Sequence, residues 1–392
     1  MVAGPLTGTT VVDLTRFVSG PFATMVLASL GARVLKIEVP PLGDSYRSQG
    51  LTSTDGMSAL FESVNRGKES VALDFREPDG ADALELLLAG SDFLVHNARP
   101  GSMERYGLDF DSVHQRHPWL IHGSISAFGD LGPQAERGGF DRIVQAESGL
   151  MSVTGSEASG PVKVGTPMLD IGAGLAAVTA LLAAHVTRLT TNIGSEASSS
   201  LLEFAMASFT TLAGDVLLNG ISPALLGSHS SSFAPYGGFS TRNGNIVIAG
   251  AGDERLWLIL CEVLGRPDLA TDSRFIDNLS RVKHRDKLTD IINSVLGSED
   301  LETWLERFEV AGIPAGQVQP LHNVLVSPQV QSLDIIRTST DATDGTVAAV
   351  DPPFRINGER PRLKASPQFG AHTRSVLREF GTSPESLERL AP

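Results

Sequence analysis

Short apolar runs that resemble strands alternate with longer helical segments through the first part of the chain. Strands are expected at residues 9–14, 32–39, 70–75, 92–97 and 119–126, and helices at 21–30 and 79–89. This alternation is typical of βαβ units, in which parallel strands are buried on both faces. The first 150 residues therefore predict an α/β fold with a parallel, doubly wound sheet.

The composition of the rest of the chain changes once, at a stretch rich in Gly, Ser and Pro. Helices are expected at residues 170–190 and 199–218, after which the stretch 219–238 turns to Gly, Ser and Pro, where we expect a domain crossing. A hairpin follows, with Asn243-Gly244 as its tight turn. Further helices are expected at 254–264, 282–295, 300–311 and 372–380.

The composition is that of a metabolic α/β enzyme. A chain of 392 residues is longer than a usual single domain, so two domains or one large elaborated domain are expected. Aromatic residues make up only 6% and Gly is abundant, which favours close-packed helices on a parallel sheet.

The charge and the cysteine content limit which binding partners and which cellular location are expected. The formal charge of −14 repels polyanions and no run of Lys and Arg offsets it, so no nucleic-acid partner is expected. Cys261 stands alone, which excludes an intrachain disulfide and fits a reducing, cytoplasmic location; its apolar setting predicts a buried helix face. The apolar run 171–186 is short for a bilayer and the first residues do not resemble a signal peptide, so no membrane partner is expected.

The first βαβ unit imitates a dinucleotide-binding site that ends in Glu38, where a ribose-binding acid would sit. Only Gly20 lies between strand and helix, so the three-glycine turn that admits a pyrophosphate is missing. Residues 172–177 match the spacing better, but no β-branched strand precedes them. An NAD-dependent dehydrogenase is therefore a remote alternative, and the histidine spacing gives no support for a metal site.

One carboxylate, Asp170, stands among glycines at the start of an apolar helix, in the segment GTPMLDIGAGLAA. Asp is a favoured N-cap residue, so capping is one interpretation. The other is a nucleophile: the glycines would let a thioester approach, and the N–H groups of the helix turn would keep the carboxylate ionised. The segment alone leaves both open.

Six blocks in order along the chain resemble the family III CoA-transferases, the formyl-CoA and carnitine CoA-transferase group. Besides the Asp170 segment they are LTRFVSGPFATMVLASLGARVLKIEVPPLGD, VNRGKESVALDFREPDG, NARPGSMERYGLD, GGFDRIVQAESGLMSVTG and DSRFIDNLSRVKHRD. The resemblance implies a large Rossmann-like domain from residues 1–218 and 326–392, a smaller α+β domain at 225–325, and an interlinked homodimer. It also implies no tightly bound cofactor, with coenzyme A entering as an acyl-CoA substrate beside a small carboxylic acid.

Asp170 falls on the catalytic carboxylate of that family. The resemblance implies that it attacks an acyl-CoA such as succinyl-CoA, giving an aspartyl anhydride and then an aspartyl-CoA thioester. It further implies a substrate loop at Gly237 and Gly238. The implied CoA contacts are Arg16, Val18, Ser19, Leu73, Arg76, Asn97, Arg99, Arg105, Gly138, Gly139, Phe140 and Asp141. Arginine suits phosphate because its fork binds two oxygens, whereas Leu73 also fits an ordinary core and Asn97 a turn.

Departures from the family pattern bear on the reaction. The α-methylacyl-CoA racemases of the same fold carry a histidine base where Phe140 stands, and phenylalanine cannot accept a proton, which favours transfer. Oxalate-handling members carry glutamine where Val18 stands, so a longer or branched acid is expected. Dicarboxylates and aromatic or carnitine-like acids stay open as acceptors. A protein that binds CoA without turnover is the last alternative, and the retained Asp170 argues against it.

Overall fold

The chain forms two compact units. The computed structural model describes residues 4–52, 58–250, 252–341 and 345–391. The first unit comprises Met1–Ser148, Gly165–Thr210 and Pro328–Pro392, and the second comprises Gly149–Val164 and Thr211–Ser327. The division places residues 149–164 and 211–218, which the sequence assigned to the large domain, with the second unit.

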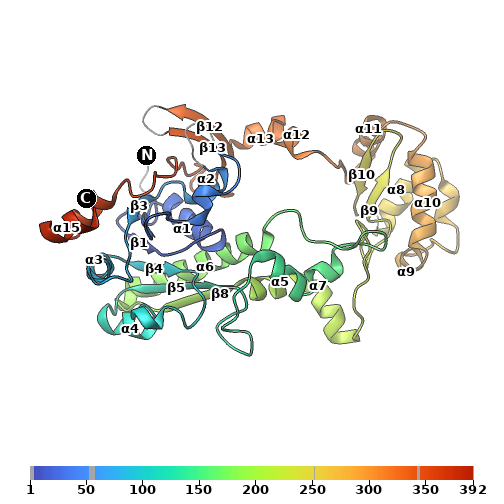
Figure 1. Cartoon of the computed structure of the whole chain (residues 1–392). Helices are drawn as coiled ribbons and strands as arrows, with labels where there is room; N and C mark the ends of the chain where they lie inside the picture. The colour runs from blue at the N-terminus through green and yellow to red at the C-terminus, as the bar shows by residue number, and fades with distance from the viewer. Residues whose placement is uncertain (1–3, 53–57, 251, 342–344, 392) are drawn as a thin grey trace. The chain divides into compact units, whose positions relative to one another are not determined.

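A six-stranded parallel sheet forms the centre of the first unit (Figure 1). Its order is β3-β2-β1-β4-β5-β8, so the chain reverses direction across the sheet between β1 and β4. The strands are β1 Thr10–Asp13, β2 Arg33–Glu38, β3 Glu69–Ala72, β4 Phe93–His96, β5 Ile121–Ser126 and β8 Glu196–Ser200. The predicted α/β fold with a parallel sheet is confirmed.

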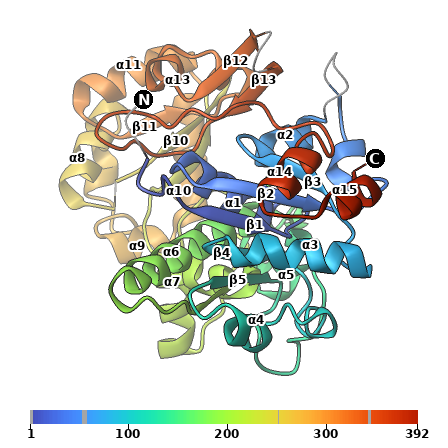
Figure 2. The same cartoon turned by 90° about the vertical axis from the view of Figure 1, so that its left-hand side faces the viewer.

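Helices cover both faces of this sheet (Figure 2). On one face α1 (Ser19–Ser29) packs against α6 (Met168–Thr191), and Leu181 of α6 lies over Gly123 of β5. On the other, α3, α4, α14 and α15 share a hydrophobic cluster with Val12 and Leu94 of the strands. These four helices are Pro78–Ala89, Phe110–Arg116, Thr373–Glu379 and Pro384–Leu390.

The C-terminal segment returns to the first unit. An antiparallel hairpin, β12 (Ile336–Asp341) and β13 (Gly345–Val350), leads into it. Arg66 pairs with Asp351 at 2.6 Å, and both side chains are buried. The predicted terminal helix corresponds to α14, whereas the hairpin and α15 have no counterpart in the prediction.

One strand of the sheet was missed. Residues 196–200, EASSS, form β8 and pair with β5, where the sequence predicted the start of a helix at 199. A run of small polar residues has low strand propensity, so its pairing with β5 decides its conformation. The helix that follows, α7 (Leu201–Asn219), is broken at Thr210.

The second unit has its own core. Strands β9 (Gly237–Ser240), β10 (Asn245–Ile248) and β11 (Ala315–Gln317) form an antiparallel sheet, and the turn at Asn243-Gly244 joins the first two, as predicted. Cys261 is buried in this core, as expected, and burial raises the pKa of its thiol to about 12. Its main helices are α8 Glu254–Val263, α9 Asn278–Lys283, α10 Arg285–Leu296 and α11 Leu301–Ala311.

Short elements complete the description. The remaining helices are α2 Ala59–Asn65, α5 Asp141–Glu147, α12 Leu321–Leu325 and α13 Pro328–Leu333, with 3₁₀ turns η1 Ser45–Ser48, η2 Glu104–Tyr106, η3 Leu150–Val153 and η4 Pro267–Ala270. Strands β6 (Gly155–Ser156) and β7 (Gly160–Pro161) form a small hairpin.

Helix α6 is longer than the apolar run that predicted it. By length and composition alone, α6 could cross a membrane, as could the two bent halves of α7 if they are counted as one span. The core helix of a soluble protein passes the same test. In the first unit α6 packs on β5, β8 and α1, and this packing accounts for the apolar residues on that face of the helix.

Buried charges lie near the carboxyl ends of β1 and β2 and just before the start of β3. Lys68 lies 3.0 Å from Asp13, and Lys36 lies 3.0 Å from Asp44, with all four side chains almost fully buried. Burial alone would raise the pKa of Asp13, but Lys68, Lys36 and hydrogen bonds from Thr15 and Thr24 hold it below its ordinary value. This stabilisation is present at neutral pH and is lost on acidification below pH 3.8, the ordinary pKa.

We expect Lys68→Met to lower the free energy of unfolding by about 3–5 kcal/mol, because the buried Asp13 carboxylate loses its ammonium partner. Urea denaturation followed by circular dichroism measures the change. The double variant Asp13→Asn/Lys68→Met should cost less than the two single losses added together. The exposed Arg378→Met is the control, and a loss below about 1 kcal/mol for Lys68→Met would contradict the assigned role of the pair.

Candidate active site

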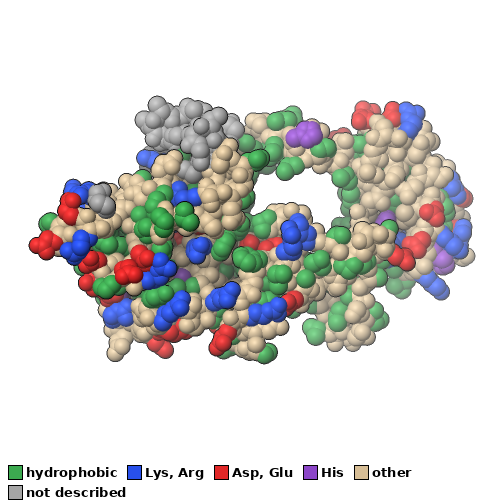
Figure 3. Space-filling model, viewed as in Figure 1, with side chains coloured by type: hydrophobic (Ala, Val, Ile, Leu, Met, Phe, Trp, Pro, Cys, Tyr) green, Lys and Arg blue, Asp and Glu red, His purple; other side chains and the backbone are tan. Residues whose placement is uncertain are grey.

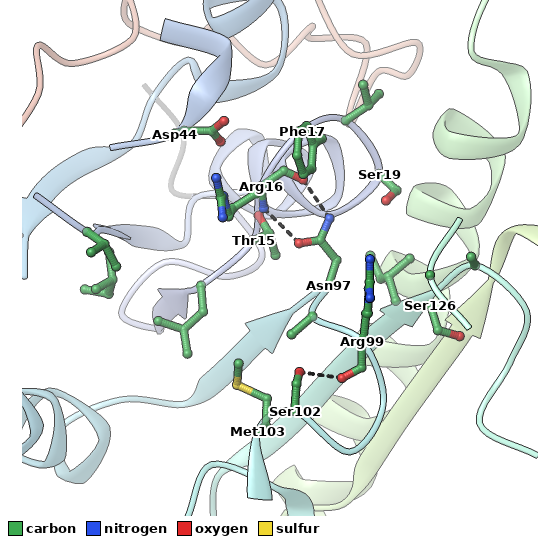
Figure 4. A pocket seen from close by; sticks show the side chains of 18 of the residues that line it. Thr15, Arg16, Phe17, Ser19, Asp44, Asn97, Arg99, Ser102, Met103 and Ser126 are labelled. Carbon is green, nitrogen blue, oxygen red and sulfur yellow. Dashed lines mark hydrogen bonds between the residues drawn. The ribbon is translucent and has the colours of Figure 1, made fainter. Parts of the chain in front are cut away.

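A cavity of about 870 Å³ opens at the carboxyl edge of the parallel sheet in the first unit. Its walls are the segments that follow β1, β2, β3, β4 and β5, as Figure 4 shows for Thr15, Asp44 and Asn97. Asp170 from α6 also lines the cavity. Ligands of open α/β sheets bind at this edge, where the strand order reverses. The size suits a large ligand.

Asp170 occupies the first turn of α6 but does not cap it. The helix begins at Met168 after Pro167, so Asp170 is its third residue and the N-cap interpretation is wrong. The capping acceptor comes from elsewhere in the chain: Asp141 accepts the N–H groups of Leu169 at 2.8 Å and Asp170 at 3.3 Å. The Asp170 carboxylate is left to face the cavity.

Two glycines of α6 serve packing. A Cβ on Gly172 would lie 1.9 Å from the ring of Phe204, and one on Gly174 would lie 2.8 Å from the carbonyl oxygen of Ser19. The expected role of Gly172 in giving a substrate access to the backbone is therefore not supported, because the missing side chain makes room for Phe204. At Gly174 the close approach brings the start of α1, and with it Ser19, beside Asp170.

The surroundings of Asp170 favour its neutral form. Burial raises the pKa of Asp170 to about 7, the negative charge of Asp141 adds to the rise, and a hydrogen bond from Ser19 opposes it. The expectation that helix N–H groups keep this carboxylate ionised is wrong, since the N–H groups of Leu169 and Asp170 are directed to Asp141. Near neutral pH the Asp170 carboxyl therefore exists in both its neutral and its ionised form.

The cavity wall is rich in guanidinium groups. Those of Arg16, Arg99 and Arg105 have no ion-pair partner among the described residues, and all three side chains are exposed. Arg76 is paired with Asp74 at 2.6 Å, and Arg137, which the sequence did not indicate, with Glu147 at 2.5 Å. On the face seen in Figure 3, basic side chains are interspersed with acidic and hydrophobic ones.

Asn97 contacts the chain itself. Its Oδ1 accepts the N–H of Arg16 at 2.8 Å, and its Nδ2 donates to the carbonyl oxygen of Arg16 at 2.6 Å (Figure 4). Both ends of the amide are therefore occupied by protein. Phe17 and Tyr46 also line the cavity, and no sequence signal singled them out.

Most of the other predicted site residues line the cavity, and four do not. The structure brings to the cavity wall, besides Asp170, the residues Arg16, Val18, Ser19, Arg76, Asn97, Arg99, Arg105, Gly138, Gly139 and Phe140. Leu73 is a member of the hydrophobic core, 1% exposed, and Asp141 is buried beneath the start of α6. Gly237 and Gly238 lie in strand β9 of the second unit, not in a loop.

Among the described residues, no group of three or more His, Cys, Asp and Glu side chains is placed to hold a metal ion. The dinucleotide-like residues 172–177 lie inside α6, where no strand leads into a glycine turn. The geometry therefore gives no support to a nicotinamide site.

Comparison with known proteins identifies the family of the chain. Residues 6–373 match the model of CoA-transferase family III. The chain is 35% identical to succinyl-CoA:glutarate CoA-transferase of Mus musculus, covering 96% of this chain and 86% of that protein. It is 34% identical to acetyl-CoA:oxalate CoA-transferase of Acetobacter aceti, covering 98% and 97%. A crystal structure of a CAIB/BAIF family protein from Brucella suis matches with a TM-score of 0.85 at 32% identity, covering 96% of this chain and all of that one.

The fold is thus that of a CAIB/BAIF family structure, an α/β protein with a parallel sheet. The chain belongs to CoA-transferase family III and is an enzyme of the CoA-transferase type. The remote dehydrogenase alternative is set aside by this membership.

We expect the Asp170 carboxyl to titrate near pH 7, because it is partly buried beside Asp141. Carbon-13 NMR of protein labelled at the aspartate carboxyls measures this, with the signal identified by its loss in Asp170→Asn. Ser19→Ala should raise the pKa, since a hydrogen bond to the anion is lost. Asp141→Asn should lower it, because the neighbouring charge is removed while an oxygen still accepts the helix N–H groups. A wild-type value near 3.8 would contradict the assignment.

Proposed function

We propose that Asp170 is the nucleophile of the transfer reaction. Three carboxylates line the cavity in the described part of the chain. Glu38 is held by Arg47 at 2.7 Å and Asp44 by Lys36 at 3.0 Å, whereas Asp170 has no cationic partner there. A carboxylate without a counter-ion, half-buried and with a raised pKa, is a stronger nucleophile than a solvated one, and this observation carries the proposal.

The chemistry is a double displacement. The Asp170 carboxylate oxygen adds to the acyl carbonyl carbon of the donor, the C–S bond breaks, and CoA leaves as the thiolate, giving an aspartyl anhydride. The thiolate sulfur then adds to the Asp170 side-chain carbonyl, which releases the donor acid and leaves an aspartyl-CoA thioester. The acceptor carboxylate runs the two steps in reverse, so Asp170 is regenerated as the anion.

The cavity wall suits the CoA portion of the substrate. Arg16, Arg99 and Arg105 are exposed and free of ion pairs among the described residues, so they are available to the phosphate oxygens. Gly138 and Gly139 also line the cavity, where the missing side chains make room for Arg99 and for Ala127. Asn97 supports this wall through the backbone of Arg16.

We propose succinyl-CoA as donor and a dicarboxylic acid of the glutarate type as acceptor. The support is that relatives matched over nearly the whole chain are named succinyl-CoA:glutarate CoA-transferases, in Mus musculus and in Homo sapiens. The apolar Val18 on the cavity wall argues for a longer acid than oxalate. Oxalate therefore belongs in the acceptor panel as a comparison.

The alternatives are weaker. Racemisation needs a second base on the opposite face of the substrate carbon, and none of the residues lining the cavity in the described chain is a histidine. Phe140 stands at the position the racemases use for their base, with its ring packed against Phe17. Binding without turnover gives no reason for a raised pKa on an unpaired carboxylate.

The assembly also belongs to the proposal. We propose the interlinked homodimer of the family, in which exposed apolar side chains of α6, such as Val186 and Leu189, would be covered. The molar mass in solution tests whether the protein is a dimer.

Two further expectations stay predictions. Gly237 and Gly238, although they begin a strand, stay our prediction for a segment near the substrate. A cytoplasmic location stays a prediction.

We expect incubation with succinyl-CoA to leave a CoA-sized adduct on the peptide that carries Asp170, and hydroxylamine to convert it to a hydroxamate. Peptide mass spectrometry detects both. Asp170→Asn should bind succinyl-CoA with an affinity within about threefold of the wild type but lose exchange by at least about a thousandfold, since the nucleophile is gone.

The negative outcomes separate the alternatives. Exchange that survives in Asp170→Asn would exclude the covalent route. Deuterium entering the α-carbon of a 2-methylacyl-CoA in heavy water, without any adduct, would favour the racemase. Binding of a panel of acyl-CoAs with neither adduct nor exchange would favour a CoA-binding protein.

We expect Arg105→Met to raise KM for succinyl-CoA by about 10- to 100-fold with little change in kcat, because one charge-assisted contact to a phosphate is lost. Steady-state kinetics measures this. The thioester of N-acetylcysteamine, which lacks the phosphates, should react equally with variant and wild type. Arg378→Met, remote from the cavity, is the charge-matched control, and an unchanged KM in Arg105→Met would contradict the contact.

A further inference from the structure

The loop between β1 and α1 contains an unusual backbone. Phe17 has a φ of +67°, in the left-handed region that side chains other than glycine rarely adopt. The residue lines the cavity and lies two positions before Ser19, the hydrogen-bonding neighbour of Asp170. A bulky residue held in such a conformation at a cavity wall calls for a functional explanation.

Neighbouring residues hold this conformation in place. Asn97 fixes the backbone of Arg16 from both sides, with bonds of 2.8 and 2.6 Å (Figure 4). Thr15 is fixed in turn, because its N–H donates to Asp13 at 2.8 Å and its carbonyl oxygen accepts Lys36 Nζ at 2.9 Å. Helix α1 begins at Ser19, two residues after Phe17, so the loop is anchored on both sides of Phe17.

The conformation places the Phe17 ring between two other aromatic rings. Its centroid lies 5.8 Å from that of Tyr46 and 5.4 Å from that of Phe140, and both pairs meet edge to face. The three rings, which we call the aromatic collar, come from the segments after β1, after β2 and before α5.

The collar adjoins Asp170. Tyr46 is close enough for the charge of Asp170 to raise the pKa of its phenol, in addition to the effect of burial. Phe140 directly precedes Asp141, which accepts the N–H of Asp170. The rings of Tyr46 and Phe17 therefore lie on the side of the cavity where the covalent intermediates of the proposed function would form, and Phe140, 62% exposed, lies at the solvent edge of the collar.

Those intermediates are vulnerable to water. A water oxygen that adds to the acyl carbon of the anhydride breaks its C–O bond, giving the free acid and the Asp170 carboxylate. Water that adds to the aspartyl-CoA thioester breaks its C–S bond, giving the Asp170 carboxylate and CoA thiol. In either case the net reaction is hydrolysis of acyl-CoA, and transfer is lost.

We propose that the aromatic collar excludes water from the intermediates on Asp170, and that Asn97 is a positioning residue that holds Phe17 in the collar. This inference rests on the proposed function. It assigns Phe17, Tyr46 and Phe140 a role in the partition between acceptor acid and water, and it assigns Asn97 to the backbone of the Arg16–Phe17 turn instead of to CoA.

The test is the ratio of hydrolysis to transfer. Release of CoA thiol from succinyl-CoA without acceptor measures hydrolysis, and formation of glutaryl-CoA measures transfer. Phe17→Ala and Asn97→Ala should each raise the ratio by at least about tenfold, because water gains access to the acyl carbon. Leu131→Ala, a 90% exposed position outside the cavity lining, is the control and should leave the ratio unchanged.

Two further variants identify the cause. Phe17→Gly removes the ring but suits the left-handed backbone, so a raised ratio in this variant assigns the effect to the ring. Asn97→Asp keeps the acceptor for the Arg16 N–H but loses the donor to its carbonyl oxygen, so it should raise the ratio less than Asn97→Ala. The extra hydrolysis in Phe17→Ala should vanish when Asp170→Asn is added, because it passes through the intermediates.

The outcomes distinguish a failure of this inference from a failure of the proposed function on which it rests. If wild-type protein forms no adduct and transfers no CoA, the proposed function itself fails. If the wild type transfers CoA while both folded Phe17 variants keep the wild-type ratio, the collar does not exclude water and the inference is overturned. If Asn97→Ala does not fold, Asn97→Asp still decides the positioning role, and an unchanged ratio there overturns it.

Discussion

The structure depends first on a group of buried charges near the carboxyl ends of β1 and β2 and just before the start of β3. Asp13 joins Lys68 to Thr15 and Thr24, and Lys36 bonds to the carbonyl oxygen of Thr15. Removing one member would leave a buried charge without a partner. This lowers the free energy of unfolding far more than the loss of a surface ion pair does. The same bonds hold the loop that carries Arg16, Phe17 and Ser19. Because this loop lines the cavity, the buried charges also hold the cavity wall in place.

A second constraint is the close approach of α1 and α6. Gly174 leaves room for the backbone at Ser19, and this contact brings Ser19 beside Asp170. The first turn of α6 is satisfied by Asp141, a carboxylate that stabilises the helix start while its charge raises the pKa of Asp170. Asp141 therefore accepts the N–H groups at the start of α6 and also raises the pKa of Asp170. The cost is that two negative charges lie close together when both acids are ionised.

Sequence reasoning succeeded where local composition and tertiary contacts agree. The apolar runs of β1, β2, β4 and β5 and the Asn243-Gly244 turn are local signals that the fold preserves. The polar residues of β8 carry no such signal, since only pairing with β5 makes them a strand. The same holds for Phe17 and Tyr46: an aromatic residue in a loop is unremarkable until the fold brings three rings together. Arg137 belongs to none of the motifs, and only the fold brings it to the cavity wall.

By itself the sequence determined the class of fold, the family and the position of the unusual carboxylate, because periodicity and ordered motifs are properties of the chain. Only the tertiary structure decided that Asp170 lies beyond the helix cap, that Leu73 is core and that Asn97 is occupied by the backbone of Arg16. The ionisation of Asp170 was decided there too. It depends on burial and on a charge supplied by Asp141, a residue far away in the sequence, and distance in space cannot be derived from spacing along the chain.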